Sequence, residues 1–269
     1  MKRFFSAFLV VLAVAVPSHA GLTINYTGPA QYQAAFNSAE TTWESILIGY
    51  QGGVAVSSSQ GSSVSPGGTL TNVIIDATVE DIDGVGGTLG SAGPTAVISD
   101  NLGFTLATDG RMRFDEDDVA NLSSSGTLEA VILHEMAHVL GFGTLWVANN
   151  VYSNGSGEYT GAAATLQWQT EFGQTGTPDV ELQGGTGTAD GHWNENFGGN
   201  GLVGITDSMG RDMRDEIMTG WLNPNPFISR MTIESFSDIG FEVAAVPEPN
   251  SLLLLAAGTF GLMRRRRKS

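Results

Sequence analysis

The feature that most constrains this 269-residue chain is the segment of residues 131–146, VILHEMAHVLGFGTLW. It contains His134 and His138, which are four positions apart. On a helix, such residues lie on the same face, so two imidazoles can bind one metal ion. Most other positions of residues 127–140 are apolar, as in a buried helix. The sequence therefore predicts a central buried helix that presents two metal ligands.

Glu135 stands directly after the first of these histidines, where its carboxylate can reach a metal-bound water. Two histidines four apart with this glutamate form the motif of zinc peptidases, in which the glutamate is the general base. A chance match on a buried helix has the same letters. The motif alone therefore leaves both interpretations open.

The histidine content favours the metal site. The chain has four histidines, and His19 lies in a predicted secretion signal, so the mature chain keeps His134, His138 and His192. A catalytic Zn²⁺ site uses three protein ligands and leaves one position for water. We therefore expect His192 to be the third ligand. Glu158 is the alternative, at an interval typical of the thermolysin-like gluzincins, but it stands in a Gly/Ser-rich loop sequence.

Residues beyond the two histidines carry a resemblance to a known family. Gly141 follows at the spacing of the metzincin signature, whereas Thr144 stands where that signature has its third histidine. In the leishmanolysin-like branch a long insertion precedes the third histidine, and here His192 follows in the sequence GHWNE. Met218 lies in DEIMTG, which resembles the Met-turn segment. Between about residues 111 and 243, the chain resembles a bacterial leishmanolysin-like metzincin.

The resemblance implies an α+β fold over residues 21–246. A twisted, mostly parallel N-terminal sheet is expected to pack on an N-terminal helix and on the motif helix, beside a smaller irregular C-terminal subdomain. The activity implied is that of a zinc endopeptidase, in which Glu135 activates a zinc-bound water. Gly141 is expected to turn the chain out of the helix. Met218 is expected beneath the metal, although an ordinary core methionine fits the same position.

The resemblance also places residues 111–115 as the edge strand nearest the cleft, binding the substrate through Arg111, Met112 and Arg113. The acids that follow invite a second hypothesis. Glu116, Asp117 and Asp118 are candidates to bind Ca²⁺ together with Asp109 or Asp115. No spaced loop motif accompanies them, so a solvated turn is the competing interpretation.

Both ends of the chain carry sorting features. Residues 1–20 have a basic start, an apolar run and a small-x-small site, which predict a signal peptide. Residues 247–269 contain Pro-Glu-Pro, an apolar run too short for a stable membrane span, and an arginine cluster. A marginal hydrophobic tail is one interpretation. The order of features, however, resembles the PEP-CTERM signal of Gram-negative bacteria. It implies transient anchoring in the inner membrane, processing by an exosortase, and a final place at the cell surface or in the extracellular matrix.

Composition limits the partners. The body between these signals has 27 acidic residues and five arginines, and the whole chain has no cysteine. Such a surface repels nucleic acid and anionic lipid, so the expected partners are a peptide or protein substrate and the exosortase. A rival function is a surface or matrix adhesion protein with a structural or degenerate metal site. The intact Glu135 argues against a degenerate site.

Periodicity predicts the remaining elements. Helices are expected over residues 31–48, 162–172 and 232–239, strands over 22–26, 71–79 and 95–99, and a surface loop over 57–68.

Overall fold

The computed structural model describes residues 21–51, 56–194 and 203–245. The predicted signal peptide and the predicted sorting segment 247–269 lie outside these residues. The elements, in chain order, are β1 (Gly21–Thr27), η1 (Ala30–Tyr32), α1 (Gln33–Ile46), β2 (Leu47–Tyr50), β3 (Val56–Gln60), β4 (Asn72–Glu80), β5 (Gly90–Asp100), β6 (Thr105–Asp115), α2 (Glu116–Ser125), α3 (Leu128–Leu140), α4 (Ala162–Glu171), η2 (Met213–Asp215), α5 (Arg230–Asp238) and β7 (Phe241–Val243). Within the described ranges, no helix is both long and apolar enough to cross a bilayer.

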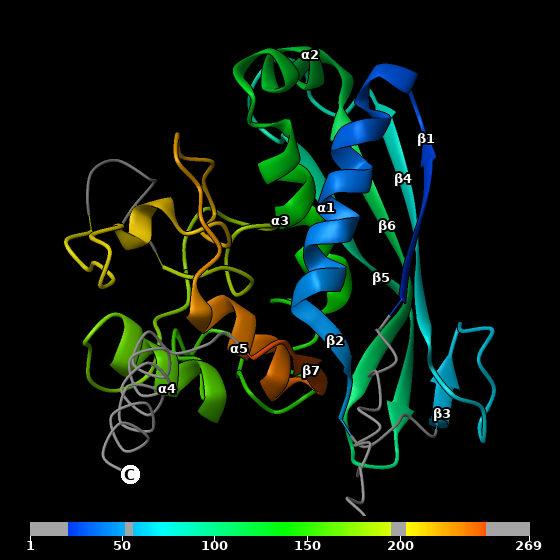
Figure 1. Cartoon of the computed structure of the whole chain (residues 1–269), viewed down its shortest axis with the longest axis vertical. Helices are drawn as coiled ribbons and strands as arrows, with labels where there is room; N and C mark the ends of the chain where they lie inside the picture. Colours follow the sequence, from blue (N-terminus) through cyan, green and yellow to red (C-terminus); the bar gives the residue numbers. More distant parts are fainter. Residues whose placement is uncertain (1–20, 52–55, 195–202, 246–269) are drawn as a thin grey trace, which may run out of the picture.

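A five-stranded sheet of order β1-β4-β6-β5-β3 forms the N-terminal half (Figure 1). Strands β1, β4 and β6 pair in parallel, whereas β5 is antiparallel to both β6 and β3. Only β5 therefore runs against the others among the strands of this sheet. This confirms a mixed α/β architecture with a mostly parallel central sheet.

Helices α1 and α3 lie on the same face of this sheet (Figure 1). The indole N–H of Trp43 on α1 donates to the carbonyl of Leu133 on α3 over 3.0 Å, so the two helices are tied inside the core. On β6, a side chain at Gly110 would overlap with Val139 of α3. The absence of a side chain at this position lets the motif helix lie directly on the sheet.

Several predicted elements are confirmed with shifted bounds. The helix predicted over residues 31–48 opens with a 3-10 turn and ends at Ile46, because Leu47 has an extended backbone and begins β2. The predicted loop 57–68 is partly wrong, since its first residues belong to β3, which pairs with β5. The strands predicted over 22–26, 71–79 and 95–99 correspond to β1, β4 and β5.

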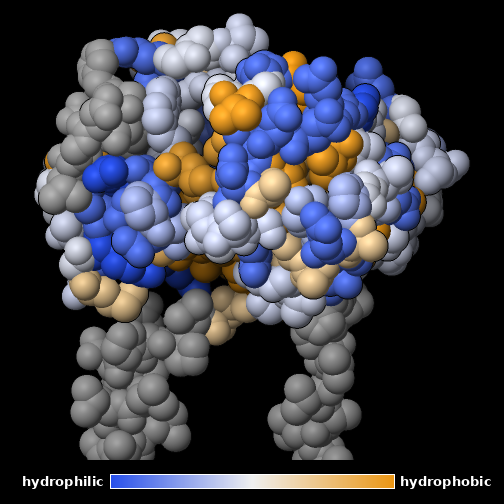
Figure 2. All heavy atoms as spheres, turned by 90° about the horizontal axis from the view of Figure 1, so that it is seen from above, coloured by the Kyte–Doolittle hydropathy of each residue, from blue (hydrophilic) through white to orange (hydrophobic). Residues whose placement is uncertain are grey.

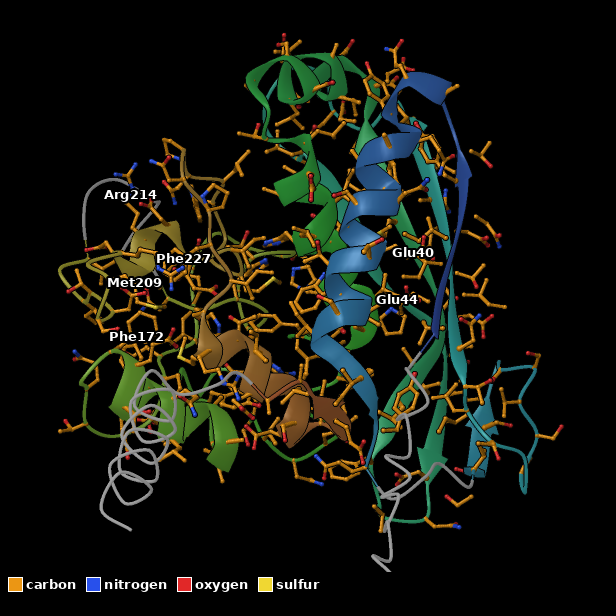
Figure 3. The ribbon with its side chains drawn as sticks, viewed as in Figure 1. Glu40, Glu44, Phe172, Met209, Arg214 and Phe227 are labelled. Atoms are coloured by element: carbon orange, nitrogen blue, oxygen red, sulfur yellow. The ribbon has the colours of Figure 1, made fainter. Side chains whose placement is uncertain are left out.

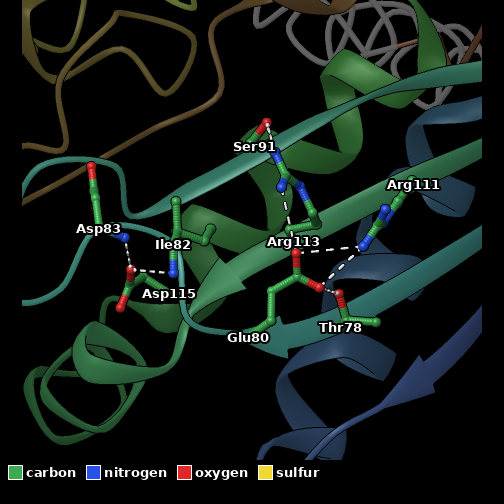
Figure 4. Close-up of polar contacts among 8 residues, drawn as sticks. All are labelled: Thr78, Glu80, Ile82, Asp83, Ser91, Arg111, Arg113 and Asp115. Atoms are coloured by element: carbon green, nitrogen blue, oxygen red, sulfur yellow. Dashed lines mark hydrogen bonds and ion pairs between the residues drawn. The ribbon is translucent and has the colours of Figure 1, made fainter.

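The expectation that residues 111–115 form the edge strand nearest the cleft is wrong. They belong to β6, which lies between β4 and β5. Met112 is fully buried in the core. Arg111 and Arg113 point to the opposite face, where both form ion pairs with Glu80 over 3.1 and 3.4 Å (Figure 4). The next strand, β5, lies between β6 and β3, and its residues 90–94 extend beyond the part that pairs with β3.

The acids after β6 form the first turn of α2, in which Glu116 and Asp117 are exposed and Asp118 is buried, so the solvated turn is confirmed in part. Asp115 caps this helix by accepting the N–H of Asp117. Its second oxygen accepts the N–H groups of Ile82 and Asp83 (Figure 4) and that of Gly84. Carboxylate oxygens surrounded by N–H donors are poorly placed to bind a cation. Within the described ranges, the acids of this segment do not gather into a metal-sized cluster, so the Ca²⁺ expectation finds no support.

The chain after α3 builds the smaller, irregular C-terminal half. Helices α4 and α5 pack against each other, and Phe172 and Phe227 are buried in this half (Figure 3). Figure 3 also labels Glu44 on α1, which accepts the N–H of Leu22 on β1. Strand β7 then returns to pair with β2, which follows α1. The two halves are therefore joined at both ends of the C-terminal segment.

We expect Asp115→Asn to lower the melting temperature by several degrees, because an amide NH₂ would face backbone N–H donors. Asp117→Asn on the exposed side of the same turn is the matched control and leaves the melting temperature nearly unchanged. Thermal unfolding measured by circular dichroism compares the two. Equal melting temperatures would contradict the role of Asp115.

The same group predicts a pH dependence. The backbone hydrogen bond from Asp83, followed by those from Asp117, Gly84 and Ile82, lowers the pKa of Asp115 below that of an unfolded aspartate. Its stabilisation is therefore complete above the ordinary aspartate pKa and is lost as the pH falls through the lowered folded-state value. In Asp115→Asn this part of the acid destabilisation should disappear.

Candidate metal centre

Three histidines from distant parts of the chain meet at one point. His134 and His138 project from α3, and His192 comes from the irregular loop that follows α4. Their Nε2 atoms are 3.0 Å apart in all three pairs. They form the one group of metal-capable side chains found within the described ranges.

The other ring nitrogen of each histidine is bonded to a backbone carbonyl. Nδ1 of His134 lies 2.7 Å from the oxygen of Ile217, and Nδ1 of His138 lies 2.9 Å from that of Phe142. Nδ1 of His192 lies 2.8 Å from the carbonyl of Thr188. A carbonyl oxygen only accepts hydrogen bonds, so each Nδ1 carries the proton. Each Nε2 therefore presents its lone pair to the other two.

Protonation does not relieve this contact. Burial lowers the pKa of His134, and it lowers the pKa of His138 well below the ordinary value. Burial likewise lowers the pKa of His192 to about 3. Three neutral imidazoles with convergent lone pairs repel one another unless a cation lies between them. An ideal tetrahedral site with Zn–N bonds of about 2.1 Å separates its nitrogens by roughly 3.4 Å, close to the observed spacing.

Glu135 lies beside this cluster and is buried. No hydrogen bond within the described part of the chain reaches its carboxylate, and burial raises its pKa to about 8. The carboxylate packs against Gly90 of β5, where an added Cβ would lie 3.1 Å from Oε1. Gly90 thus leaves the room that this carboxylate needs. A nearby divalent cation would favour the ionised form and oppose the rise in pKa.

The four side chains line a cleft of about 940 Å³ between the two halves of the molecule. One wall is residues 87–92, another is α3, and the rest comes from residues 184–192 and 216–223. Seen from above, apolar residues lie in the middle of the molecule between more hydrophilic sides (Figure 2). Within the described strands, β3 pairs only with residues 97–100 of β5. Among the described residues, no strand pairs with the outer edge of residues 90–94, of which residues 90–92 line the cleft.

Other side chains that could have been the third ligand, namely Thr144, Glu158 and Asp190, are outside the histidine cluster and form other hydrogen bonds. Thr144 donates its hydroxyl to the carbonyl of His138 over 2.6 Å, which closes the end of α3. Glu158 is exposed and accepts a hydrogen bond from Thr177. Asp190 accepts hydrogen bonds from the Tyr152 hydroxyl and from the N–H of Gly155. The structure thus brings His192, and not Glu158, to the two histidines of the motif.

Gly141 has the predicted left-handed backbone, with φ of 116°. An added Cβ would lie 2.9 Å from Ile239, so the chain leaves α3 where only glycine fits. Met218 is fully buried, its N–H donates to Glu216, and its carbonyl accepts the N–H of Trp193. Its backbone is therefore part of the site's support. The placement of its side chain beneath the metal stays a prediction.

Arg111, Met112 and Arg113 are absent from the residues that line the cleft. Residues 90–92 of β5 line the cleft instead, and sequence periodicity identified this strand only over residues 95–99. Gly143 was also missed. A Cβ at Gly143 would overlap with the backbone of Gly191, so the turn after α3 touches the residue that precedes His192. The second glycine in Gly-Phe-Gly is the only signal that could have indicated it.

The buried carboxylate of Glu216 fixes the segment that supports two ligands. It accepts the N–H of Met218, the N–H and hydroxyl of Ser229, and the hydroxyl of Thr232. Burial raises the pKa of Glu216, and these hydrogen bonds oppose the rise. Thr232 in turn accepts the indole N–H of Trp193. The neighbours of His134 and His192 are therefore held by one network.

Comparison with known proteins bears on the C-terminus. Residues 245–268 match the PEP-CTERM protein-sorting motif. Comparison with curated proteins gives no match. The motif implies that the chain is exported, recognised by an exosortase and sorted to the cell surface, as the sequence predicted.

We expect Glu216→Gln to reduce the free energy of unfolding by about 1–3 kcal/mol, because the amide NH₂ must face a donor in either orientation. Denaturant unfolding of the purified protein measures the change. Glu242→Gln, an exposed site on β7, is the matched control and should stay within about 0.5 kcal/mol of the parent. A Glu216→Gln protein as stable as this control would show that the network does not depend on the carboxylate.

Proposed function

We propose that the chain is a zinc-dependent endopeptidase of the leishmanolysin-like metzincin type. The observation that carries the proposal is the convergence of three neutral Nε2 lone pairs, 3.0 Å apart, beside a buried carboxylate in an open cleft. Three imidazoles are the ligand set of several catalytic zinc sites. Gly141, Thr144 and the long segment before His192 support the leishmanolysin-like assignment.

The residues of the chain supply the remaining chemistry. When bound, Zn²⁺ supplies a Lewis acid that polarises the scissile carbonyl and acidifies water. Glu135 takes the proton of the attacking water and later gives it to the leaving amine. Its buried position and its lack of a competing hydrogen bond keep it available for both transfers. The carbonyls of Ile217, Phe142 and Thr188 hold the imidazoles in the neutral, metal-binding tautomer.

The free edge of β5 is the proposed place where an extended substrate adds as a further strand. Residues 90–94 present unpaired backbone groups next to Glu135, and Pro94 marks the end of this stretch. Among the described residues that line the cleft there is no lysine or arginine, whereas Glu135, Asp190 and Glu216 are acidic. Neutral or basic stretches of a peptide therefore fit this cleft better than acidic ones.

The rival proposal is an adhesion protein with a structural metal site. Structural zinc sites are closed by four protein ligands, whereas the described residues contribute three that face a cleft. Glu135 also has no structural partner within the described part of the chain. The peptidase proposal accounts for both observations. The sorting motif fits either function, because it determines location and not chemistry.

Glu135→Gln should lower peptide-bond cleavage by about 10²–10⁴-fold, because it removes only the general base. Zn²⁺ binding and the melting temperature should remain close to the parental values. The assay is hydrolysis of casein with and without a chelator. Glu129→Gln on the same helix, outside the cleft lining, is the control and keeps parental activity. Parental cleavage by Glu135→Gln would exclude the assigned base.

His192→Ala should weaken Zn²⁺ affinity by more than the ~10–100-fold expected when an outer partner of a ligand is lost. Glu158→Ala should leave the affinity unchanged, because Glu158 is exposed and lies outside the cluster. Competitive titration against a chromophoric chelator measures both. If Glu158→Ala loses the metal while His192→Ala keeps it, the ligand set is that of a gluzincin.

A further inference from the structure

The third histidine differs from the other two in its support. His134 and His138 project from α3, which is packed against the sheet and α1. His192 lies in an irregular loop, and its Nδ1–H donates to the carbonyl of Thr188, four residues earlier. The orientation of its ring therefore depends on how precisely this carbonyl is placed.

The side chain of Thr188 fits between two glycines. An added Cβ at Gly184 would lie 2.7 Å from both Cβ and Cγ2 of Thr188, and 3.0 Å from the ring of Trp221. An added Cβ at Gly220 would overlap with the same Cγ2. The methyl group of Thr188 therefore fills a slot that only glycines leave open. Threonine is suited to such a slot because its branched Cβ restricts χ1.

This slot connects the supports of two ligands. Gly220 belongs to the segment in which Ile217 accepts the Nδ1–H of His134. Thr188 belongs to the segment that orients His192. The contact between the Thr188 methyl and Gly220 thus fixes the carbonyl partner of the third ligand relative to that of the first.

We propose that Thr188 is a positioning residue for the metal centre: its methyl group, seated between Gly184 and Gly220, places the carbonyl that orients His192. The inference rests on the three-histidine site of the proposed function and not on peptidase activity. Metal affinity is therefore the quantity that should respond to this contact.

The first test introduces a clash between residue 220 and the Thr188 methyl and then removes it. Co²⁺ affinity and the visible spectrum of the bound ion are measured for each variant. Gly220→Ala should weaken Co²⁺ binding by about 10–100-fold, as expected when an outer partner moves. The double variant Gly220→Ala/Thr188→Ser lacks the obstructing methyl and should recover most of the affinity. Glu242→Gln, at an exposed site outside the cleft and the histidine cluster, is the control and should bind Co²⁺ as the parent does.

A second pair of variants introduces no clash with Gly220 and covers the case in which Gly220→Ala fails to fold. Thr188→Ala removes the methyl and should weaken Co²⁺ binding by up to about tenfold. Thr188→Val keeps a methyl for the slot and should bind as the parent does. Both proteins without metal should melt close to the parental temperature, because the effect acts on the ligand.

The outcomes distinguish the positioning role of Thr188, the metal centre and the peptidase activity from one another. Equal Co²⁺ affinities for Thr188→Ala and Thr188→Val would overturn the positioning role. The same conclusion follows if Gly220→Ala retains parental affinity. A parental protein that binds no Co²⁺ would overturn the metal centre itself, and the inference with it. A protein that binds Co²⁺ as expected but cleaves no peptide would overturn only the peptidase proposal.

Discussion

The site depends on three backbone carbonyls that determine the tautomers of three histidines. The carbonyls of Ile217, Phe142 and Thr188 each accept a hydrogen bond from the Nδ1–H of one histidine. The Nε2 lone pairs of the three rings then point toward a common point. Without a cation, this arrangement is repulsive. A metal ion between the three nitrogens would relieve this repulsion, so metal binding would stabilise the folded state.

The C-terminal half contributes these three carbonyls and the third histidine. The turn after α3 brings Phe142 beside His138, and Gly143 brings the loop of His192 into backbone contact. Glu216, buried with four donors, holds the segment that carries Ile217. Buried hydrogen bonds can hold the side chains of an irregular segment in fixed positions without helices or strands.

The features that the sequence predicted correctly are those that depend on residues close together in the chain. The interval between His134 and His138 and the apolar pattern of α3 are properties of a single helix, so both followed from the letters. The count of histidines predicted His192 because the candidates were few. The glycine after the motif helix indicated where the chain must bend, and Gly141 has the expected left-handed backbone.

The predictions that were wrong or missing concern contacts between distant segments of the chain. The resemblance predicted a strand over residues 111–115, but these five residues do not determine which strands pair with it, so the central place of β6 could not be derived from them. The acids 115–118 have the same composition whether they bind a cation or backbone N–H groups, and only the loop of residues 82–86 decides between them. Thr188 gives no signal at all, since its role arises from contact with Gly220.

Strand β5 lines the cleft, whereas β6 lies inside the sheet, and the two strands support the site in different ways. Because β6 is interior, its residues Gly110 and Met112 can pack under α3 and hold the motif helix. Because β5 runs against β6 and reaches beyond its pairing with β3, residues 90–94 keep one edge free beside Glu135. An unpaired edge is an aggregation hazard on an ordinary surface. Here its residues 90–92 line a cleft between the two halves, and under the proposed function an extended peptide would pair with the same backbone groups.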